Sequence, residues 1–383
     1  MKPLTIHALL RAYRDGALTP PQHIDALRAQ HRGDDPAWIT LCGEAFIAAQ
    51  MQALHGRRPD ELPLYGVPFA VKDNIDVAGL PTTAACPAFA YTPGEHASCV
   101  QRLLDAGAVL VGKTNLDQFA TGLVGTRSPY GEVPNSFDAE RVSGGSSSGS
   151  ASVVARGLVP FALGTDTAGS GRVAAGFNNI VGLKPTAGRV GTQGVVPACR
   201  TLDVVSVFAL TVEDAAPVMA VIDGGDAAPA FQHLALRPSS FGRGPRVGVP
   251  FSAQWPGDEG YGEAWQQALR DAQSLAAPLE RIDISVLHEV ARLLYDGPWV
   301  AERHAVMQVL LQAQPEAIDP VVRRVVESAR DHDVALIPPP LGLGSIELAD
   351  GQWVKGFICE PWALHDARNI SAHGGWRAYL RSR

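Results

Sequence analysis

Two serine- and glycine-rich turns contain the side chains of this sequence that are best suited to chemistry. The first turn, SGGSSSGSA, includes Ser146, and the second, GTDTAGSGR, includes Ser170, 24 residues further along the chain. A lysine, Lys72, follows the apolar run YGVPFAV upstream of both turns. A serine becomes nucleophilic when a base removes its proton, and a lysine can be that base when burial lowers its pKa. The three residues predict a nucleophile, a second hydroxyl that passes a proton, and a base, with no histidine needed.

The second turn is also suited to stabilising negative charge. Residues 164–171 are nearly all small, so the backbone N–H groups of a tight turn there can converge on one point and bind an oxyanion. A Gly/Ser-rich loop taken alone is equally consistent with a plain turn. A single lysine after an apolar run is more often an exposed strand end. The presence of all three motifs together favours catalysis.

Two other motif matches fail a test of their context. Residues 107–114, GAVLVGKT, match the P-loop expression, but residues 108–111 between the glycines read as a strand rather than a flexible loop. Residues 145–149, GSSSG, match the nucleophile elbow of α/β-hydrolases, which must follow a strand. The segment before them, NSFDAERVSG, is polar and typical of a turn. We therefore expect no nucleotide site, and without an HExxH or clustered His/Cys pattern we expect no metal or other cofactor.

Composition limits the class of partner. The 383 residues carry a net charge of −7, which argues against nucleic acid or an anionic membrane as partner. The five cysteines form no CxxC pair, which favours thiols in a reducing compartment. Neither a signal peptide nor an apolar run long enough to span a bilayer is found. We predict a cytoplasmic protein that acts on a small molecule, and a homo-oligomer is left open.

The elements that must position these residues follow from the pattern of apolar residues. The first 30 residues show helical spacing, interrupted at Gly16 and at Pro20. From Leu62 onwards, short β-rich runs such as GVPFAVKD, GAVLVGKTN, LVPFALGTD and DVVSVFALT alternate with helical stretches. This alternation predicts an α/β fold with a central mixed β-sheet covered by helices. RVGVPF reads as a further strand, residues 263–330 as mostly helical, and the tail as a hairpin around Ala349-Asp350-Gly351.

Four phrases identify a family resemblance. AVKDNIDVAGLPTTA, GKTNLDQFA, SGGSSSGSA and GTDTAGSGR occur in this order, and they resemble the motifs of the amidase signature family over residues 1–337. The resemblance implies an amidase-signature fold and a Ser-Ser-Lys amide hydrolase. It implies that Ser170 is the nucleophile, Ser146 a bridging serine on a cis peptide and Lys72 the base. The oxyanion-hole amides would be those of Thr167, Ala168, Gly169 and Ser170, with Arg172 as a supporting residue. Ala174 stands where the family usually has proline, which would fix the backbone after the nucleophile.

Within this family the sequence is most similar to allophanate hydrolases, in the runs GVVPACRTLDVVSVFALTVEDA and LLYDGPWVAERHAVM. The resemblance implies hydrolysis of allophanate, urea-1-carboxylate, through an acyl-enzyme, with Tyr295 and Arg303 as the pair that binds the substrate carboxylate. Arginine suits a carboxylate because it can bind it bidentately. The two residues are eight apart, so we expect them on one face of one helix. The alternative is a surface ion pair between Glu302 and Arg303. For the whole chain, the alternatives are an amidase acting on another small amide, or a non-catalytic truncated remnant.

The resemblance also predicts an internally shortened chain. The tail LGLGSIELADGQWVKGFICEPWAL resembles the end of the separate C-terminal domain of full-length allophanate hydrolases, and DHDVALIPPP runs almost directly into it. We therefore expect an amidase-signature domain over residues 1–337 that lacks its last part, and a remnant of the other domain over residues 338–383. An incomplete sheet would leave an unpaired edge.

Overall fold

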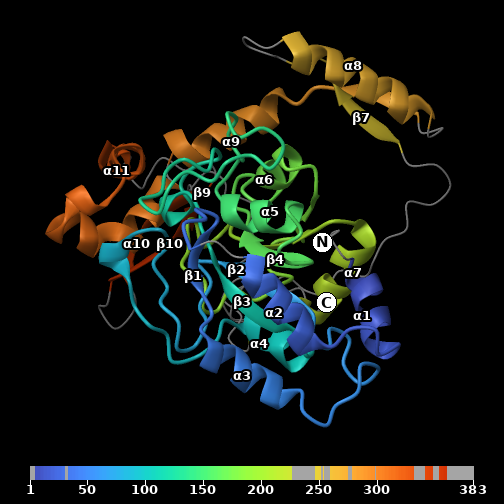
Figure 1. Ribbon diagram of the computed structural model, residues 1–383. Helices are drawn as coiled ribbons and strands as arrows, with labels where there is room; N and C mark the ends of the chain where they lie inside the picture. Colours follow the sequence, from blue (N-terminus) through green and yellow to red (C-terminus); the bar gives the residue numbers. More distant parts are fainter. Residues whose placement is uncertain are drawn as a thin grey trace, which may run out of the picture.

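A mixed sheet of six strands, in the order β1-β3-β2-β4-β6-β5, forms the centre of the molecule (Figure 1). The structure is a computed structural model that describes residues 5–30, 33–226, 246–251, 253, 259–274, 278–297, 299–331, 341–347 and 353–359. The strands are β1 Trp38–Leu41, β2 Pro68–Lys72, β3 Val109–Thr114, β4 Phe161–Thr165, β5 Val181–Leu183, β6 Val205–Ala209, β7 Val247–Pro250, β8 Leu279–Ile282, β9 Leu341–Glu347 and β10 Trp353–Cys359.

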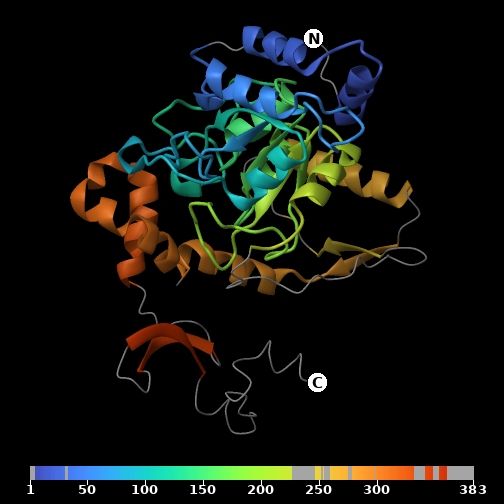
Figure 2. The ribbon, with the colours of Figure 1, turned by 90° about the horizontal axis from the view of Figure 1, so that it is seen from below.

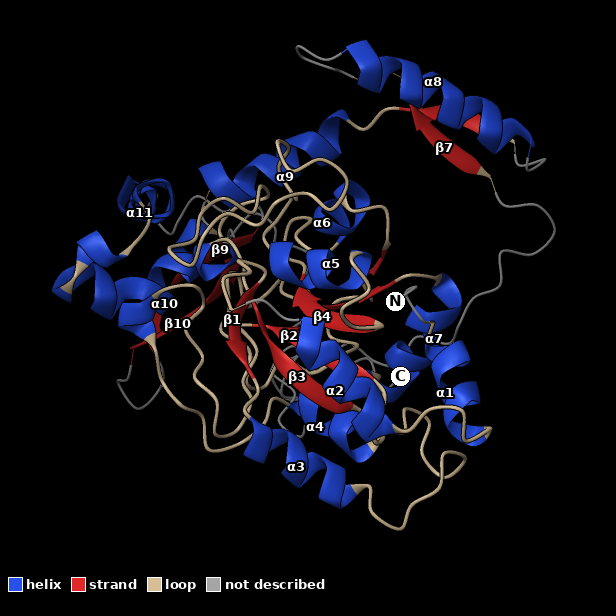
Figure 3. Cartoon of the chain, in the orientation of Figure 1, coloured by secondary structure: helices blue, strands red, loops and turns tan. Residues whose placement is uncertain are grey.

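Helices lie on both faces of this sheet (Figure 3). The α-helices are α1 Ile6–Arg14, α2 Pro20–Gln30, α3 Glu44–Ala53, α4 Ser98–Asp105, α5 Ser148–Ala155, α6 Arg172–Phe177, α7 Val212–Ile222, α8 Glu259–Ser274, α9 Ser285–Asp296, α10 Val300–Ala313 and α11 Pro320–Glu327. Short 3₁₀ helices are η1 Pro87–Phe89, η2 Gln118–Ala120, η3 Pro315–Ala317 and η4 Ser328–Asp331.

The three parallel strands β2, β3 and β4 end at the same edge of the sheet, which is called the functional edge below. β2 pairs in parallel with β3 on one side and with β4 on the other. Because crossovers between parallel strands are right-handed, α4 between β2 and β3 and α5 between β3 and β4 lie on opposite faces (Figure 1). The loops that leave β2 and β3 therefore diverge at their carboxyl ends. In open α/β sheets such a divergence opens the crevice in which ligands bind.

Close packing places α5 against these strands. β2 and β4 are buried along their whole length, as parallel strands covered on both faces must be. Phe69 and Phe161 stack between them with ring centroids 5.3 Å apart. The sequence of α5, SGSASVVA, is made of small residues, and its first seven are buried. A β-carbon at Gly149 would lie 2.3 Å from Ala37 O, so glycine permits this close approach.

A second apolar cluster attaches the later helices to the core. Met307 and Leu311 of α10 and Val322 of α11 pack with Phe119 of η2 and with Cys86, which precedes η1. Outside the six-stranded sheet, β7 and β8 pair in parallel and are connected through α8, and β9 pairs with β10 as an antiparallel hairpin. Figure 2 shows this hairpin, in red, apart from the central sheet.

Most of the elements expected from the pattern are present. The break after α1, the four buried β-rich runs, the strand in RVGVPF and the tail hairpin are confirmed. The pattern did not indicate β1 or β5, and the mostly helical segment 263–330 also contains β8. The predicted junction at residues 332–340 lies outside the described residues. Within the part that the structure describes, no helix is long and apolar enough to cross a membrane.

Candidate active site

Lys72 is the last residue of β2, and its side chain is completely buried. Its Nζ donates hydrogen bonds to Ser146 Oγ and to Thr165 Oγ1, each at 2.8 Å. Burial lowers the pKa of Lys72 to about 7, although the carboxylates of Asp117 and Asp203 oppose this shift. Both contacting groups are neutral hydroxyls. A large share of the amine is therefore uncharged near neutral pH and can accept a proton.

The turn that carries Ser146 is held by Asp117. The Asp117 backbone N–H donates to Ser146 O at 3.1 Å, and the Asp117 carboxylate accepts from the N–H of Gly125 at 3.0 Å. A β-carbon at Gly145 would lie 2.2 Å from Asp117 Oδ2, so only glycine fits beside this carboxylate. The peptide bond between Gly145 and Ser146 is cis, as the family resemblance implies.

Ser170 lies in the turn between β4 and α6, where it is 3% exposed. Within the described residues, its hydroxyl has no hydrogen-bond partner, and neither do the backbone N–H groups of residues 167–170. Gly169 has a φ of +147°, a conformation that favours glycine. This turn thus offers a free hydroxyl together with free amide donors, which is the combination that an oxyanion hole requires.

Arg172 is the first residue of α6, directly behind this turn. Its guanidinium donates to both oxygens of the buried Asp166 carboxylate, at 2.9 and 3.0 Å. The Asp166 N–H donates in turn to Val204 O in the loop before β6. Arg172 therefore connects the start of the turn that carries Ser170 to α6. Ala174, where the family usually has proline, is buried within the same helix.

Tyr295 and Arg303 come together, but not on one helix as the spacing predicts. Tyr295 is in α9 and Arg303 in α10, so that prediction is wrong. Gly297 separates the two helices in an extended conformation, which a following proline in the sequence favours. The Arg303 Cζ atom lies 5.2 Å from the centroid of the Tyr295 ring. The contact is therefore a cation–π contact across a helix junction.

Arg303 is also not part of a surface ion pair. Its side chain is 1% exposed, and Glu302 instead accepts hydrogen bonds from Thr201. The Arg303 Nη1 donates to Thr121 Oγ1 at 2.8 Å, whereas Nε and Nη2 have no hydrogen-bond partner among the described residues. A buried cation with two unused donors is costly unless an anion binds there.

Comparison with known proteins gives the context for this geometry. Residues 27–337 match the family model described as Amidase, and residues 305–381 match that of the allophanate hydrolase C-terminal domain.

The chain belongs to the amidase family. It is 50% identical over 304 residues to urea amidolyase from Saccharomyces cerevisiae, an alignment that covers 78% of this chain and 17% of that protein. It is 47% identical over 308 residues to urea amidolyase from Lachancea kluyveri, covering 79% of this chain and 17% of that protein. The chain therefore spans only a small part of the length of these two relatives. The structure of selenomethionine-substituted allophanate hydrolase from Kluyveromyces lactis is 42% identical, with a TM-score of 0.80, over 87% of this chain and 56% of that one.

Several residues of this candidate site were not found from the sequence. Thr165, Asp117 and Asp203 touch Lys72 or the turns around it only after folding. Asp117 stands in GKTNLDQFA, so the motif itself could have drawn attention to it. Nothing local marks Asp203. Its role depends on a contact with Thr167, 36 residues away.

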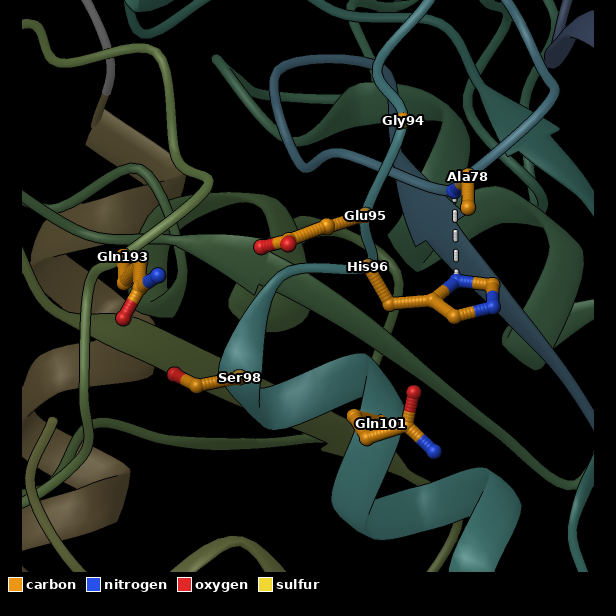
Figure 4. Close-up of a pocket in the computed structure, with 7 residues that line it drawn as sticks. All are labelled: Ala78, Gly94, Glu95, His96, Ser98, Gln101 and Gln193. Carbon is orange, nitrogen blue, oxygen red and sulfur yellow. Dashed lines mark hydrogen bonds between the residues drawn. The ribbon is translucent and has the colours of Figure 1, made fainter. Parts of the chain in front are cut away.

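No group of three or more His, Cys, Asp or Glu side chains suited to a metal ion occurs among the described residues. A separate open pocket of about 400 Å³ lies at the start of α4 (Figure 4). There the Ala78 N–H donates to His96 Nδ1 at 3.2 Å, and Glu95 and Gln193 are among the residues that line the pocket. Neither Lys72 nor the two serines line it, so it is separate from the candidate active site.

Proposed function

We propose that this amidase hydrolyses allophanate through an acyl-enzyme formed on Ser170. The observation that carries the proposal is the buried Arg303, whose Nε and Nη2 have no partner in the part of the chain that the structure describes. Its charge lowers the pKa of Lys72, so the guanidinium is close enough to act electrostatically on the base. A short substrate with a carboxylate at one end and an amide at the other would pair its anion with Arg303. Its amide would then lie toward the nucleophile turn.

The proposed first step uses the contact between Lys72 and Ser146. Neutral Lys72 accepts the Ser146 proton while Ser146 accepts that of Ser170. The Ser170 oxygen forms a bond to the carbon of the terminal amide. The amides of residues 167–170 stabilise the oxyanion that results. The protonated lysine returns its proton through Ser146 to the departing nitrogen, and ammonia leaves.

In the proposed second step, water hydrolyses the acyl-enzyme, and its proton follows the same route through Ser146 and Lys72. Water loses a proton toward Lys72 and attacks the acyl carbon, and the bond to the Ser170 oxygen breaks as that proton returns to it. The product is a dicarboxylated nitrogen compound that loses carbon dioxide. Tyr295 would cover the carboxylate end through its stacking on Arg303.

We propose the same division of the chain that the sequence predicts. Residues 1–337 would be an amidase-signature domain without its last part, and residues 338–383 a remnant of a separate C-terminal domain. The separate β9–β10 hairpin supports this division. The central sheet ends on β5, a strand of three partly exposed residues, and such a short edge offers few groups for unwanted pairing.

Ammonia release from allophanate and from a neutral short amide such as propionamide tests the substrate. Arg303→Ala should cost about 2–5 kcal/mol of transition-state binding with allophanate and little with propionamide. Arg324→Ala, which removes an exposed arginine of α11, is the control and should leave both substrates unaffected. An equal loss on both substrates would favour another small amide. No turnover of any amide would favour a non-catalytic remnant.

A further inference from the structure

The turn formed by residues 198–203 lies between the helix that carries Arg303 and the loop that carries Ser170. Its backbone closes on itself, because the N–H groups of Leu202 and Asp203 both donate to Cys199 O, at 2.9 and 2.8 Å. Its two ends contact different parts of the site. Thr201 faces α10, and Asp203 faces the residues before the nucleophile.

The contact with α10 is made by both polar groups of Thr201. The Thr201 N–H donates to Glu302 Oε2 at 3.1 Å, and the Thr201 hydroxyl donates to Glu302 Oε1 at 2.7 Å. Glu302 lies in the first turn of α10, next to Arg303. A two-point contact to a carboxylate fixes direction as well as distance.

The contact with the nucleophile loop is made by Asp203. Its carboxylate is 7% exposed and accepts from the N–H groups of Ala198 and Cys199, at 2.9 and 3.1 Å. The same carboxylate accepts a hydrogen bond from the Thr167 hydroxyl. Thr167 begins the run of free amides that ends at Ser170. One buried carboxylate therefore binds both its own turn and the loop with the oxyanion donors.

We propose that Glu302, Thr201 and Asp203 are positioning residues that hold the oxyanion loop, residues 167–170, at a fixed place relative to α10. None of them touches the substrate. This inference rests on the proposed role of that loop in amide hydrolysis, but not on allophanate being the substrate. Free amides stabilise an oxyanion only when they point at it. The loop makes no other side-chain hydrogen bond within the described residues than that of Thr167.

Thr201→Val is the principal test, because it removes the hydroxyl but leaves Arg303 and the shape of the side chain in place. We expect kcat to fall about 10- to 100-fold on both allophanate and propionamide, since a small displacement of the amides weakens every transition state. The KM for allophanate should change less than about twofold, because Arg303 still binds the carboxylate. Thr201→Ser restores the hydroxyl and should restore kcat.

A double-variant cycle tests whether the contacts form one chain. Thr167→Val breaks the same connection at its other end. If the connection is continuous, combining it with Thr201→Val should cost little more than the worse single change. Asp319→Ala, which removes the side-chain cap of α11, is the control for general loosening of the helices and should leave kcat unchanged.

A serine-reactive fluorophosphonate keeps the test independent of the substrate. Its reaction joins the Ser170 oxygen to phosphorus as the P–F bond breaks and fluoride leaves, while the Ser170 proton passes through Ser146 to Lys72. The rate depends on the oxyanion amides whether or not allophanate is hydrolysed. Slower labelling of Thr201→Val, with recovery in Thr201→Ser, is the expected result. Unchanged kcat and labelling in a folded Thr201→Val chain would overturn the inference. So would a change confined to the KM for allophanate.

Discussion

Two buried lysines lie in neighbouring parallel strands and have different partners. In the register of β2 and β3, Lys72 pairs with Thr114, and Val71 pairs with Lys113. Residues paired across a sheet point to the same face and successive residues to opposite faces, so the two lysines project from opposite faces. Both side chains are fully buried. One lysine amine therefore lies on each face of the sheet, near the carboxyl ends of β2 and β3.

The partners of these lysines explain why only one of them suits catalysis. Lys113 Nζ lies 2.9 Å from the buried carboxylate of Asp73 and donates to Thr82 Oγ1 at 2.7 Å. Burial lowers the pKa of Lys113, and the Asp73 carboxylate in contact opposes that shift. Lys72 contacts the hydroxyls of Ser146 and Thr165 and has no carboxylate in contact among the described residues. A lysine can become a base where its burial is not balanced by a direct ion pair.

The largest expected effect is on activity. Lys72→Met should lower kcat on any amide by about 10²–10⁴-fold, because it removes the proposed general base. Lys113→Met, assayed at a temperature where circular dichroism shows it folded, should retain most of the wild-type rate. Steady-state ammonia release measures both. A folded Lys113→Met chain as inactive as Lys72→Met would break the comparison.

The next effect is on stability, and its sign should differ between the two lysines. Lys113→Met leaves Asp73 buried without its counter-charge and should cost about 3–5 kcal/mol in the free energy of unfolding. Lys72→Met removes an amine that the folded state disfavours in its charged form. The free energy of unfolding of Lys72→Met should therefore exceed that of the wild type by up to about 4 kcal/mol at pH 7. Urea unfolding of the three chains measures these differences, and equal losses in both variants would contradict the distinction.

The pH dependence of that gain follows from the direction of the shift. The Lys72 pKa is about 7 in the folded state against 10.5 for an unperturbed lysine, so the unfolded chain binds more protons between these values. Stability of the wild type therefore rises with pH across this window. The stability that Lys72→Met gains over the wild type should be greatest below about pH 7 and should vanish above about pH 10.5.

The smallest effect is on the pH profile of activity. Because the base must be neutral, kcat/KM should rise with pH below about 7 and level off above it. The charge of Arg303 lowers the pKa of Lys72, so Arg303→Met should move this acid limb to higher pH. Propionamide as substrate separates this shift from lost carboxylate binding. Arg324→Met is the matched control. If the acid limb of the pH profile does not move in Arg303→Met, the proposed electrostatic effect of Arg303 on Lys72 is wrong.

The fold was predictable where burial imposes a simple pattern. β2, β3, β4 and β6 are buried throughout, so each appears in the sequence as an apolar run between Gly, Asp or Asn. β1 and β5 are edge strands of four and three residues, and their partial exposure leaves no such run. The break between α9 and α10 was missed because the Tyr295–Arg303 spacing was taken as helical across Gly297.

The sequence by itself determined the groups proposed to perform the chemistry. Ser146 lies in one short turn, and Ser170 and the amides of residues 167–170 lie in another, and the small residues of both turns are visible in the printed chain. Only the tertiary structure decided how the charged residues divide their roles. Lys72 and Lys113 each follow or end an apolar run, and no local pattern separates them. Their roles depend on which face of the sheet each side chain takes and which distant group meets it there. The same holds for Arg303, because burial and partners are properties of the assembled core rather than of any short segment.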